Sequence, residues 1–402
     1  MRMKLSKAVL ASCIVAFAAA STAYAGPDAI KIGVLTDIGG PYGDITGKGS
    51  VAAAQIAIDE IGGTVLGKPI KLLSADHQHK PDVAVTLLRN WLDNEKIDAI
   101  LDVPNSNILL LTQNLVNENR GILIASGGQS SRFTDDLCSP YSFQFNTDTF
   151  ASANGLKQLA KRPDRKKWFF VQVDGAYGDT AGADIEAAIK PLGATVIGRV
   201  KHPINTSDFA SYLLQAQSSG AQVIVFISGG ADTINAVKQA HEFGIGKKEI
   251  LVASVLYEPM VKGMSLASAQ GLVTLLAYSW DLNDETRAWA KKFEAKVGRP
   301  PTALQIGVYS GAAHYLKAVA AAGTDDRNVV AAKMHELPVD NVFVRGGQIR
   351  PDGLLLHDMM LTEVKTISES RSEWDVFKVV EVIPGAEALR PLADSKCPLV
   401  KK

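Results

Sequence analysis

The chain has 402 residues, with 42 basic and 42 acidic side chains and a hydrophobic fraction of 47%. This even charge balance argues against a nucleic-acid-binding surface, which shows as a basic excess. After residue 25 no stretch approaches 18 uninterrupted apolar residues, so we expect no membrane-spanning helix there. The remaining length, about 375 residues, exceeds what one hydrophobic core holds, and we expect two domains.

Residues 1–25 have the pattern of a secretory signal peptide. Three basic residues, Arg2, Lys4 and Lys7, precede an apolar run over residues 8–20, and small residues surround a cleavage point near Ala25. A membrane anchor is the alternative, but a run of about 13 residues is short for a span of about 20. The sequence therefore predicts export to the periplasm.

Two cysteines follow this segment, Cys138 and Cys397. An even pair in an exported protein predicts a disulfide, and two free thiols are the alternative. The bond would close a loop of about 260 residues, for which chain-entropy arguments give a stabilisation of about 4 to 5 kcal/mol.

From residue 30 onward, short apolar runs alternate with helical patterns, as in βαβ units around parallel sheets. The first series has strands at 30–35, 70–74, 99–102 and 121–125, with helices at 50–60, 81–94 and 108–118. A second series has strands at 167–173, 195–200, 222–227, 249–253 and 272–277, with helices at 151–160, 182–192, 208–218 and 233–243. Long helical patterns at 284–297 and 309–322 then need more sheet surface than the second series offers.

The predicted fold class is α/β, with two doubly wound parallel-sheet lobes. We assign residues 26–146, 278–346 and 385–402 to lobe 1, and residues 147–277 and 347–384 to lobe 2. Open parallel sheets bind ligands at the carboxyl ends of their strands, so two lobes facing each other there would form a cleft.

Five loops at these strand ends are rich in Gly, hydroxyl and amide residues, which let backbone N–H groups approach an anionic ligand, while the following helices contribute positive dipole ends. Tight turns and helix caps are the alternative interpretation. The loops are 39–44, 104–107, 126–129, 174–180 and 228–232.

Other motifs are weak. The segment 43–50 imitates a phosphate-binding P-loop but has the wrong glycine spacing, and Gly49 replaces the Ser or Thr that would bind magnesium. No dinucleotide fingerprint follows the first strand, and no nucleophile elbow occurs, which disfavours an enzyme. His77 and His79 with Asp76 have metal-ligand chemistry, but we interpret them as solvated loop residues and predict no metal and no cofactor. The segment 278–284 is either a packed hinge crossing or an aromatic cleft wall.

The segments 31–37, 40–44, 66–71, 176–178, 208–209 and 237–244 occur in an order that resembles the leucine/isoleucine/valine-binding proteins of bacterial ABC importers. The resemblance implies the type I periplasmic binding fold, in which three crossovers form a hinge and the cleft closes over ligand. It places the hinge segments near 144–147, 277–280 and 344–350. Phe150, which follows the first segment, would wall the cleft.

The resemblance also implies how an amino acid would bind. Lobe 1 would hold the carboxylate, and an acidic residue after the strand 249–253 would hold the ammonium group. Ser254 stands there instead, and the nearest acid is Glu258. This departure puts an amino-acid ligand in doubt. The predicted ligand-binding residues are Tyr42, Gly43, Asn105, Ser106, Asn107, Ser126, Gly127, Gly128, Phe150, Tyr177, Ser228, Gly229, Gly230 and Ser254.

We therefore predict a non-enzymatic, monomeric solute-binding component of an ABC importer. It would capture a small carboxylate, either a hydrophobic amino acid or an aromatic or aliphatic acid, and pass it to the permease subunits. A ligand-sensing module for a membrane receptor is the alternative, and an enzyme is the third class considered.

Overall fold

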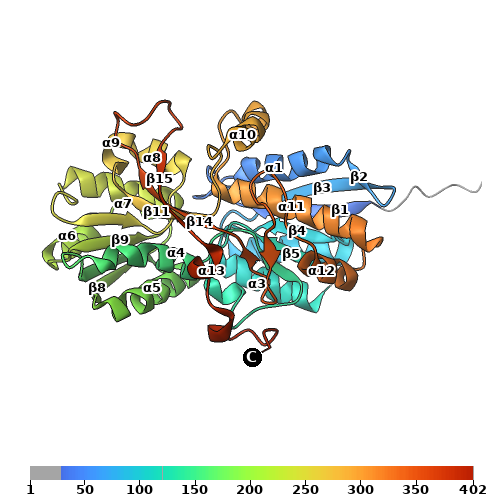
Figure 1. Ribbon diagram of the computed structural model, residues 1–402, viewed down its shortest axis with the longest axis horizontal. Coiled ribbons are helices and arrows are strands. Elements are labelled where there is room, and N and C mark those ends of the chain that lie inside the picture. Colours follow the sequence, from blue (N-terminus) through green and yellow to red (C-terminus); the bar gives the residue numbers. More distant parts are fainter. Residues whose placement is uncertain (1–28, 120, 402) are drawn as a thin grey trace, which may run out of the picture.

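A computed structural model describes residues 29–119 and 121–401, and it shows two lobes built on separate sheets (Figure 1). The predicted signal peptide and its cleavage point near Ala25 lie outside these ranges. Within them, no helix has the length and apolar character needed to cross a membrane.

Lobe 1 has a six-stranded sheet in the order β2-β3-β1-β4-β5-β6. The central strand β1 pairs in parallel with β3 and β4, and the short β2 pairs antiparallel with β3. Because both faces are covered by helices, the central strands are almost continuously apolar and buried. The strands are β1 (Ile30–Thr36), β2 (Thr64–Val65), β3 (Lys68–Asp76), β4 (Ala99–Asp102), β5 (Ile122–Ala125) and β6 (Ser142–Gln144). The helices are α1 (Gly47–Glu60), α2 (Pro81–Asn90), α3 (Ser106–Glu118), α10 (Asp284–Val297), α11 (Ala303–Ala322) and α12 (Arg327–Glu336).

Lobe 2 has a seven-stranded sheet in the order β15-β14-β11-β10-β9-β7-β8. Five strands are parallel, and β14 and β15 add an antiparallel edge. The predicted fold class is confirmed, with these antiparallel strands as an addition. The strands are β7 (Lys167–Val173), β8 (Thr195–His202), β9 (Val223–Ile227), β10 (Ile250–Ala253), β11 (Val273–Leu276), β14 (Met359–Val364) and β15 (Phe377–Ile383). The helices are α4 (Thr149–Leu156), α5 (Ala176–Ile189), α6 (Ala210–Ser218), α7 (Gly230–Glu242), α8 (Glu258–Met264) and α9 (Leu266–Ala269).

Three chain segments cross between the sheets, after β6, after β11 and before β14. Tyr278 of the second crossing joins all three. Its hydroxyl donates to the carbonyl of Phe145 in the first crossing at 2.9 Å, and its ring stacks on His357 of the third crossing at 5.0 Å. Tyr278 therefore belongs to a packed hinge, the first of the two interpretations of this segment.

The third crossing lies at residues 357–358, later than the expected 344–350. The intervening residues form a small hairpin of β12 (Gln348–Ile349) and β13 (Leu355–Leu356). This hairpin stays beside lobe 1, because Gln144 of β6 donates from its backbone N to the carbonyl of Gly353 at 2.9 Å. The first part of the range assigned to lobe 2, residues 347–356, is thus placed next to lobe 1.

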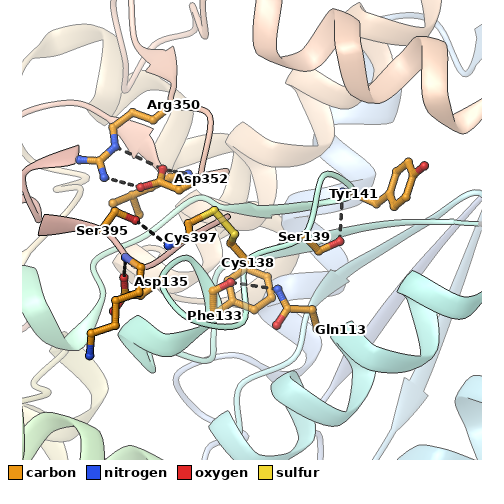
Figure 2. Close-up of a disulfide and its surroundings, with 12 residues drawn as sticks. Gln113, Phe133, Asp135, Cys138, Ser139, Tyr141, Arg350, Asp352, Ser395 and Cys397 are labelled. Carbon is orange, nitrogen blue, oxygen red and sulfur yellow. Dashed lines mark hydrogen bonds and ion pairs between the residues drawn. A yellow bond between two sulfur atoms is a disulfide. The ribbon is translucent and has the colours of Figure 1, made fainter. Parts of the chain in front are cut away.

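After β15, the short helix α13 (Gly385–Ala388) packs against α4, and the C-terminal tail then returns to lobe 1 (Figure 1). Cys397 of the tail is disulfide-bonded to Cys138, with the Cα atoms 5.5 Å apart (Figure 2). Beside the bond, the backbone N of Lys396 donates to Asp135 Oδ1 at 2.6 Å. The predicted disulfide is confirmed.

Loss of this bond should destabilise the protein. The double variant Cys138→Ala, Cys397→Ala should lose about 2 to 5 kcal/mol of unfolding free energy, because its unfolded chain is no longer closed into a loop spanning 259 residues. Urea unfolding followed by circular dichroism measures the difference. Each single variant should match the double variant, since either change removes the same bond. An unfolding midpoint equal to that of the oxidised wild-type protein would contradict the prediction.

Candidate functional site

A cavity with about 580 Å³ of empty space, part of it open to solvent, lies between the two lobes. It is bounded by the loops at the carboxyl ends of β1, β3, β4 and β5 in lobe 1 and of β7, β8, β9 and β10 in lobe 2. Its lining residues are Tyr42, Ile45, His79, Pro104, Asn105, Ser106, Asn107, Gly127, Gln129, Val173, Asp174, Gly175, Ala176, Tyr177, Ile204, Gly229, Val255, Tyr257 and Leu304.

Three helices of 13 or 14 residues begin at this cavity. The residues that precede α3, α5 and α7 are Asn105, Gly175 and Gly229, and all three belong to the lining. The N-cap residues of α5 and α7 are glycines and cap neither helix with a side chain, although the backbone N of Ala176 in the first turn of α5 donates to Asn107 Oδ1 at 3.2 Å. The positive ends of three helix dipoles therefore surround one cavity, which favours an anionic ligand.

A chain of hydrogen bonds joins three loops of lobe 1 around Asp37. The carboxylate accepts from the backbone N of Gly40 at 2.9 Å and of Tyr42 at 3.0 Å, and it faces Nδ1 of His79 at 3.4 Å. Nε2 of His79 lies 2.5 Å from Nδ2 of Asn105. Since an amide nitrogen donates, Nε2 is the acceptor and Nδ1 carries the ring proton. The network holds the loops after β1, β3 and β4 in one arrangement.

Asn105 also caps α3, because its Oδ1 accepts from the backbone N of Asn107 at 2.8 Å and of Ile108 at 3.2 Å. This fixes which end of the amide points to His79. Ser106, the first residue of α3, is thereby held in the cavity wall.

Aromatic side chains form much of the remaining wall. Tyr42 meets the ring of His79 edge-on, with centroids 4.6 Å apart. The hydroxyl of Tyr257 in lobe 2 accepts from Nε2 of Gln129 in lobe 1 at 3.0 Å, so this pair bridges the lobes. The tyrosine rings form an apolar part of the wall together with six other lining residues, namely Ile45, Pro104, Val173, Ile204, Val255 and Leu304.

Seven of the predicted residues line the cavity, namely Tyr42, Asn105, Ser106, Asn107, Gly127, Tyr177 and Gly229. Four of them come from lobe 1 loops that also carry the hydrogen-bond network. Tyr177 and Gly229 face them from lobe 2.

The other seven lie outside the lining. Three of them have side chains that contact other residues instead of the cavity. Ser126 Oγ donates to Asp102 Oδ1 at 3.4 Å, and Ser228 Oγ lies 2.9 Å from Thr233 Oγ1. The ring of Phe150 packs against the guanidinium of Arg390 at 4.3 Å. Ser254 is in contact with the site through Tyr177, whose hydroxyl lies 2.9 Å from its Oγ. Gly43, Gly128 and Gly230 allow close backbone packing, because an added Cβ would lie within 3.0 Å of a carbonyl oxygen at each position.

The predicted ligand-binding residues do not include His79, Gln129 and Tyr257, although Gln129 lies in the predicted loop 126–129. The interpretation of His77 and His79 as solvated loop residues is wrong, since both are buried and the backbone N of His79 donates to Nδ1 of His77. Their position in the sequence could have indicated a role in the site, because both histidines directly follow β3 and so lie at the same edge of the sheet as the predicted loops. Gln129 and Tyr257 likewise follow β5 and β10. Among the described residues, no group of three or more His, Cys, Asp or Glu could hold a metal ion.

With this geometry established, comparison with known proteins identifies the family. The family model described as "Periplasmic binding protein" matches residues 29–371. The chain belongs to the periplasmic binding protein family. This confirms the resemblance found in the sequence.

Two solved structures resemble the whole fold. A periplasmic binding protein from Burkholderia mallei is 38% identical, with a TM-score of 0.91, over 93% of this chain and 100% of that one. A branched-chain amino acid ABC transporter periplasmic ligand-binding protein from Burkholderia xenovorans LB400 is 39% identical, with a TM-score of 0.83, over 92% of this chain and 100% of that one.

Among curated relatives, Leu/Ile/Val-binding protein homolog 7 from Brucella suis is 26% identical over 235 residues. The match spans 56% of this chain and 58% of that relative.

Asp102 lies beneath the site at the end of β4, and burial raises its pKa from 3.8 to about 6. Among the described residues, Oδ2 of this carboxylate has no hydrogen-bond partner of good geometry, and the nearby hydroxyls of Thr36 and Ser50 offset only part of the effect of burial on the pKa. The folded protein therefore holds this proton more tightly than the unfolded chain does. It follows that ionisation of Asp102 costs folding stability as the pH rises from about 4 through about 6.

The variant Asp102→Asn should remove this cost. Asparagine keeps the size and tolerates the local φ of 81°, and the neighbouring unpartnered hydroxyl of Ser50 can accept from the new amide. We expect the variant to be more stable than the wild-type protein by about 2 to 3 kcal/mol at pH 8, with the difference vanishing near pH 4. Urea unfolding at pH 4, 6 and 8 measures this. A stability difference independent of pH would show that Asp102 is not the source.

Proposed function

We propose that this protein captures a small carboxylate with an apolar body in the periplasm and delivers it to the permease subunits of an ABC importer. The ligand class comprises hydrophobic amino acids and aromatic or aliphatic acids. The observation that carries the proposal is a single cavity, enclosed by both lobes, in which three helix N-termini meet an apolar wall with three tyrosines. The helix ends would bind the carboxylate, and the apolar wall would bind the body of the ligand.

Closure explains how such a site holds its ligand. Asn105, Ser106 and Asn107 would seat the carboxylate on lobe 1, and Tyr177 and Gly229 would cover it from lobe 2. A ligand that contacts both lobes stabilises the closed state by the difference between its affinities for the closed and open states. The permease would then recognise the closed shape. No bond in the ligand is made or broken, and the protein acts as a monomer.

Between the two ligand classes, we favour acids that lack an ammonium group. The one carboxylate in the described lining is Asp174, whose side chain is 67% exposed and lies 3.2 Å from the ammonium of Lys201. Asp232 and Glu258 are buried close by, but neither lines the cavity. At the end of β10, Ser254 offers a hydroxyl that is engaged by Tyr177 and by the carbonyl of Phe226. A ligand ammonium would lose its hydration with little compensation.

The finer localisation belongs to the same proposal. Export would use residues 1–25 as the signal peptide, with cleavage near Ala25. The mature chain would then act in the periplasm, where the disulfide between Cys138 and Cys397 persists.

Calorimetric titration tests the proposed ligands in matched pairs. Leucine and 4-methylpentanoate differ in the amino group, as do phenylalanine and 3-phenylpropanoate, and benzoate and hydroxycinnamates extend the aromatic series. We expect saturable one-to-one binding of at least one acid, and at least tenfold weaker binding of its amino-acid partner. Tighter binding of the amino acids would reverse the preference, and no heat from any carboxylate would refute the ligand class.

A pair of helix-cap variants tests the assigned site. Asn105→Ala removes the cap of α3 at the cavity, and Asp326→Ala removes the equivalent cap of α12, where Asp326 accepts from two backbone N–H groups. Asp326→Ala should lose about 1 kcal/mol of stability, and Asn105→Ala should lose more, because it also removes the donor to Nε2 of the buried His79 side chain. Asn105→Ala should in addition weaken binding of the best acid at least tenfold, while Asp326→Ala should leave it unchanged. Equal affinities for the two variants would place the ligand elsewhere.

A further inference from the structure

Helix α5 of lobe 2 carries a stripe of residues that bond to lobe 1. Ala176, Thr180 and Asp184 are spaced four residues apart, so they lie on one face of the helix. The first of them is at the cavity, and the last is about 12 Å further along the helix, outside the lining. The contacts are Ala176 N to Asn107 Oδ1 at 3.2 Å, Thr180 Oγ1 with Ser130 Oγ at 3.0 Å, and Ser131 Oγ to Asp184 Oδ2 at 2.8 Å.

The far end of this stripe meets Arg390 of the C-terminal tail. Nη2 of Arg390 lies 3.7 Å from Asp184 of lobe 2, and Nη1 lies 3.9 Å from Asp135 of lobe 1. All three side chains are largely buried, with exposed fractions of 18%, 15% and 8%. Arg390 therefore stands between one carboxylate from each lobe, where a partly desolvated charge contributes more than at the surface. The ring of Phe150 supports its guanidinium at 4.3 Å.

The tail that carries Arg390 is itself fastened. Nη1 of Arg350 donates to the carbonyl of Arg390 at 2.6 Å, and Arg350 is paired with Asp352. Seven residues further on, the disulfide of Cys397 fixes the tail to lobe 1, next to Asp135 (Figure 2). The position of Arg390 is thus determined from both sides.

We propose that the α5 stripe together with Arg390 forms a latch that stabilises the closed cleft from outside the ligand cavity. Asp184 and Arg390 are not among the residues that line the cavity, so they would influence binding only through the population of the closed state. They are positioning residues. The inference rests on the proposed closure of the cleft and not on the identity of the ligand.

A cross-linking rate measures the closed population without any ligand. The hydroxyls of Ser130 and Thr180 lie 3.0 Å apart across the lobes, so the sulfur atoms of the pair Ser130→Cys, Thr180→Cys would come close to each other in the closed state and be available for oxidation. The rate of its formation under a mild oxidant, followed by peptide mass spectrometry, reports how often the cleft closes. The native disulfide is monitored in the same digest.

In this background, Asp184→Asn and Arg390→Gln should each slow cross-linking about tenfold, the size expected for losing one charged, partly buried contact. The matched control is Glu186→Gln, which lies on the same helix but pairs with Arg199 inside lobe 2. It should leave the rate unchanged. Thermal melts by circular dichroism identify any variant that fails to fold, and either latch variant suffices for the test.

Equal cross-linking rates in the latch variants and the control would overturn the proposal, because the contacts would then persist in the open state. Slower cross-linking in the latch variants would still support the latch even if no carboxylate bound in calorimetry, because the rate is measured without ligand. Failure of the latch and failure of the proposed ligand class are therefore distinguishable.

Discussion

The hydrogen bond from Tyr278 to the carbonyl of Phe145, with the stacking of its ring on His357, joins the three segments that cross between the lobes. One cluster of buried apolar side chains runs from lobe 1 through the crossings into lobe 2, so these crossings determine where the two sheets lie relative to each other. Tyr278 is 2% exposed, and its hydroxyl satisfies a backbone carbonyl that would otherwise be buried without a partner. The contacts of Tyr278 therefore keep the strand ends of the two lobes facing each other, and the cavity between the lobes depends on that arrangement.

The chemistry at the cavity follows from parallel sheet topology. Loops after parallel strands lead into helix N-termini, and here two sheets bring three such termini to one space. Lobe 1 orders its loops through Asp37, His79 and Asn105, whereas lobe 2 presents glycines before α5 and α7 and tyrosine rings. One side is therefore a polar face ordered by hydrogen bonds, and the other contributes helix N-termini, of which α5 already donates the backbone N–H of Ala176 to Asn107 of lobe 1. Such a division suits a ligand that binds first to lobe 1.

Much of this architecture could be predicted from sequence, because parallel strands buried on both faces read as apolar runs. The run at 167–173 and the helix at 284–297 were predicted with the bounds that the structure has. The strands β14 and β15 were missed for different reasons. The edge strand β15 is half-exposed, with a weak alternation and exposed valines at 379, 380 and 382. The strand β14 lies between β15 and β11 and is buried, but its apolar run of three residues is interrupted by Thr362 and Glu363. Helix α5 begins six residues earlier than predicted, because the glycines at 175 and 178 resemble a loop. In the site, the loops could be predicted from the sequence, but the directions of their side chains could not. Ser126 and Phe150 follow the predicted strands, yet their side chains contact Asp102 and Arg390 instead of the cavity. The side chain of His79 points inward because Asp37 and Asn105 contact its two ring nitrogens.

The most direct test of the central claim, that the two lobes enclose a small carboxylate, is a crystal structure of the protein with the acid that binds best in solution. The account predicts density for the acid between residues 105–107 and residues 175–177, with its carboxylate at the helix N-termini and its body against the tyrosines. An acid bound outside this cavity, or a carboxylate turned toward the apolar wall, would contradict it.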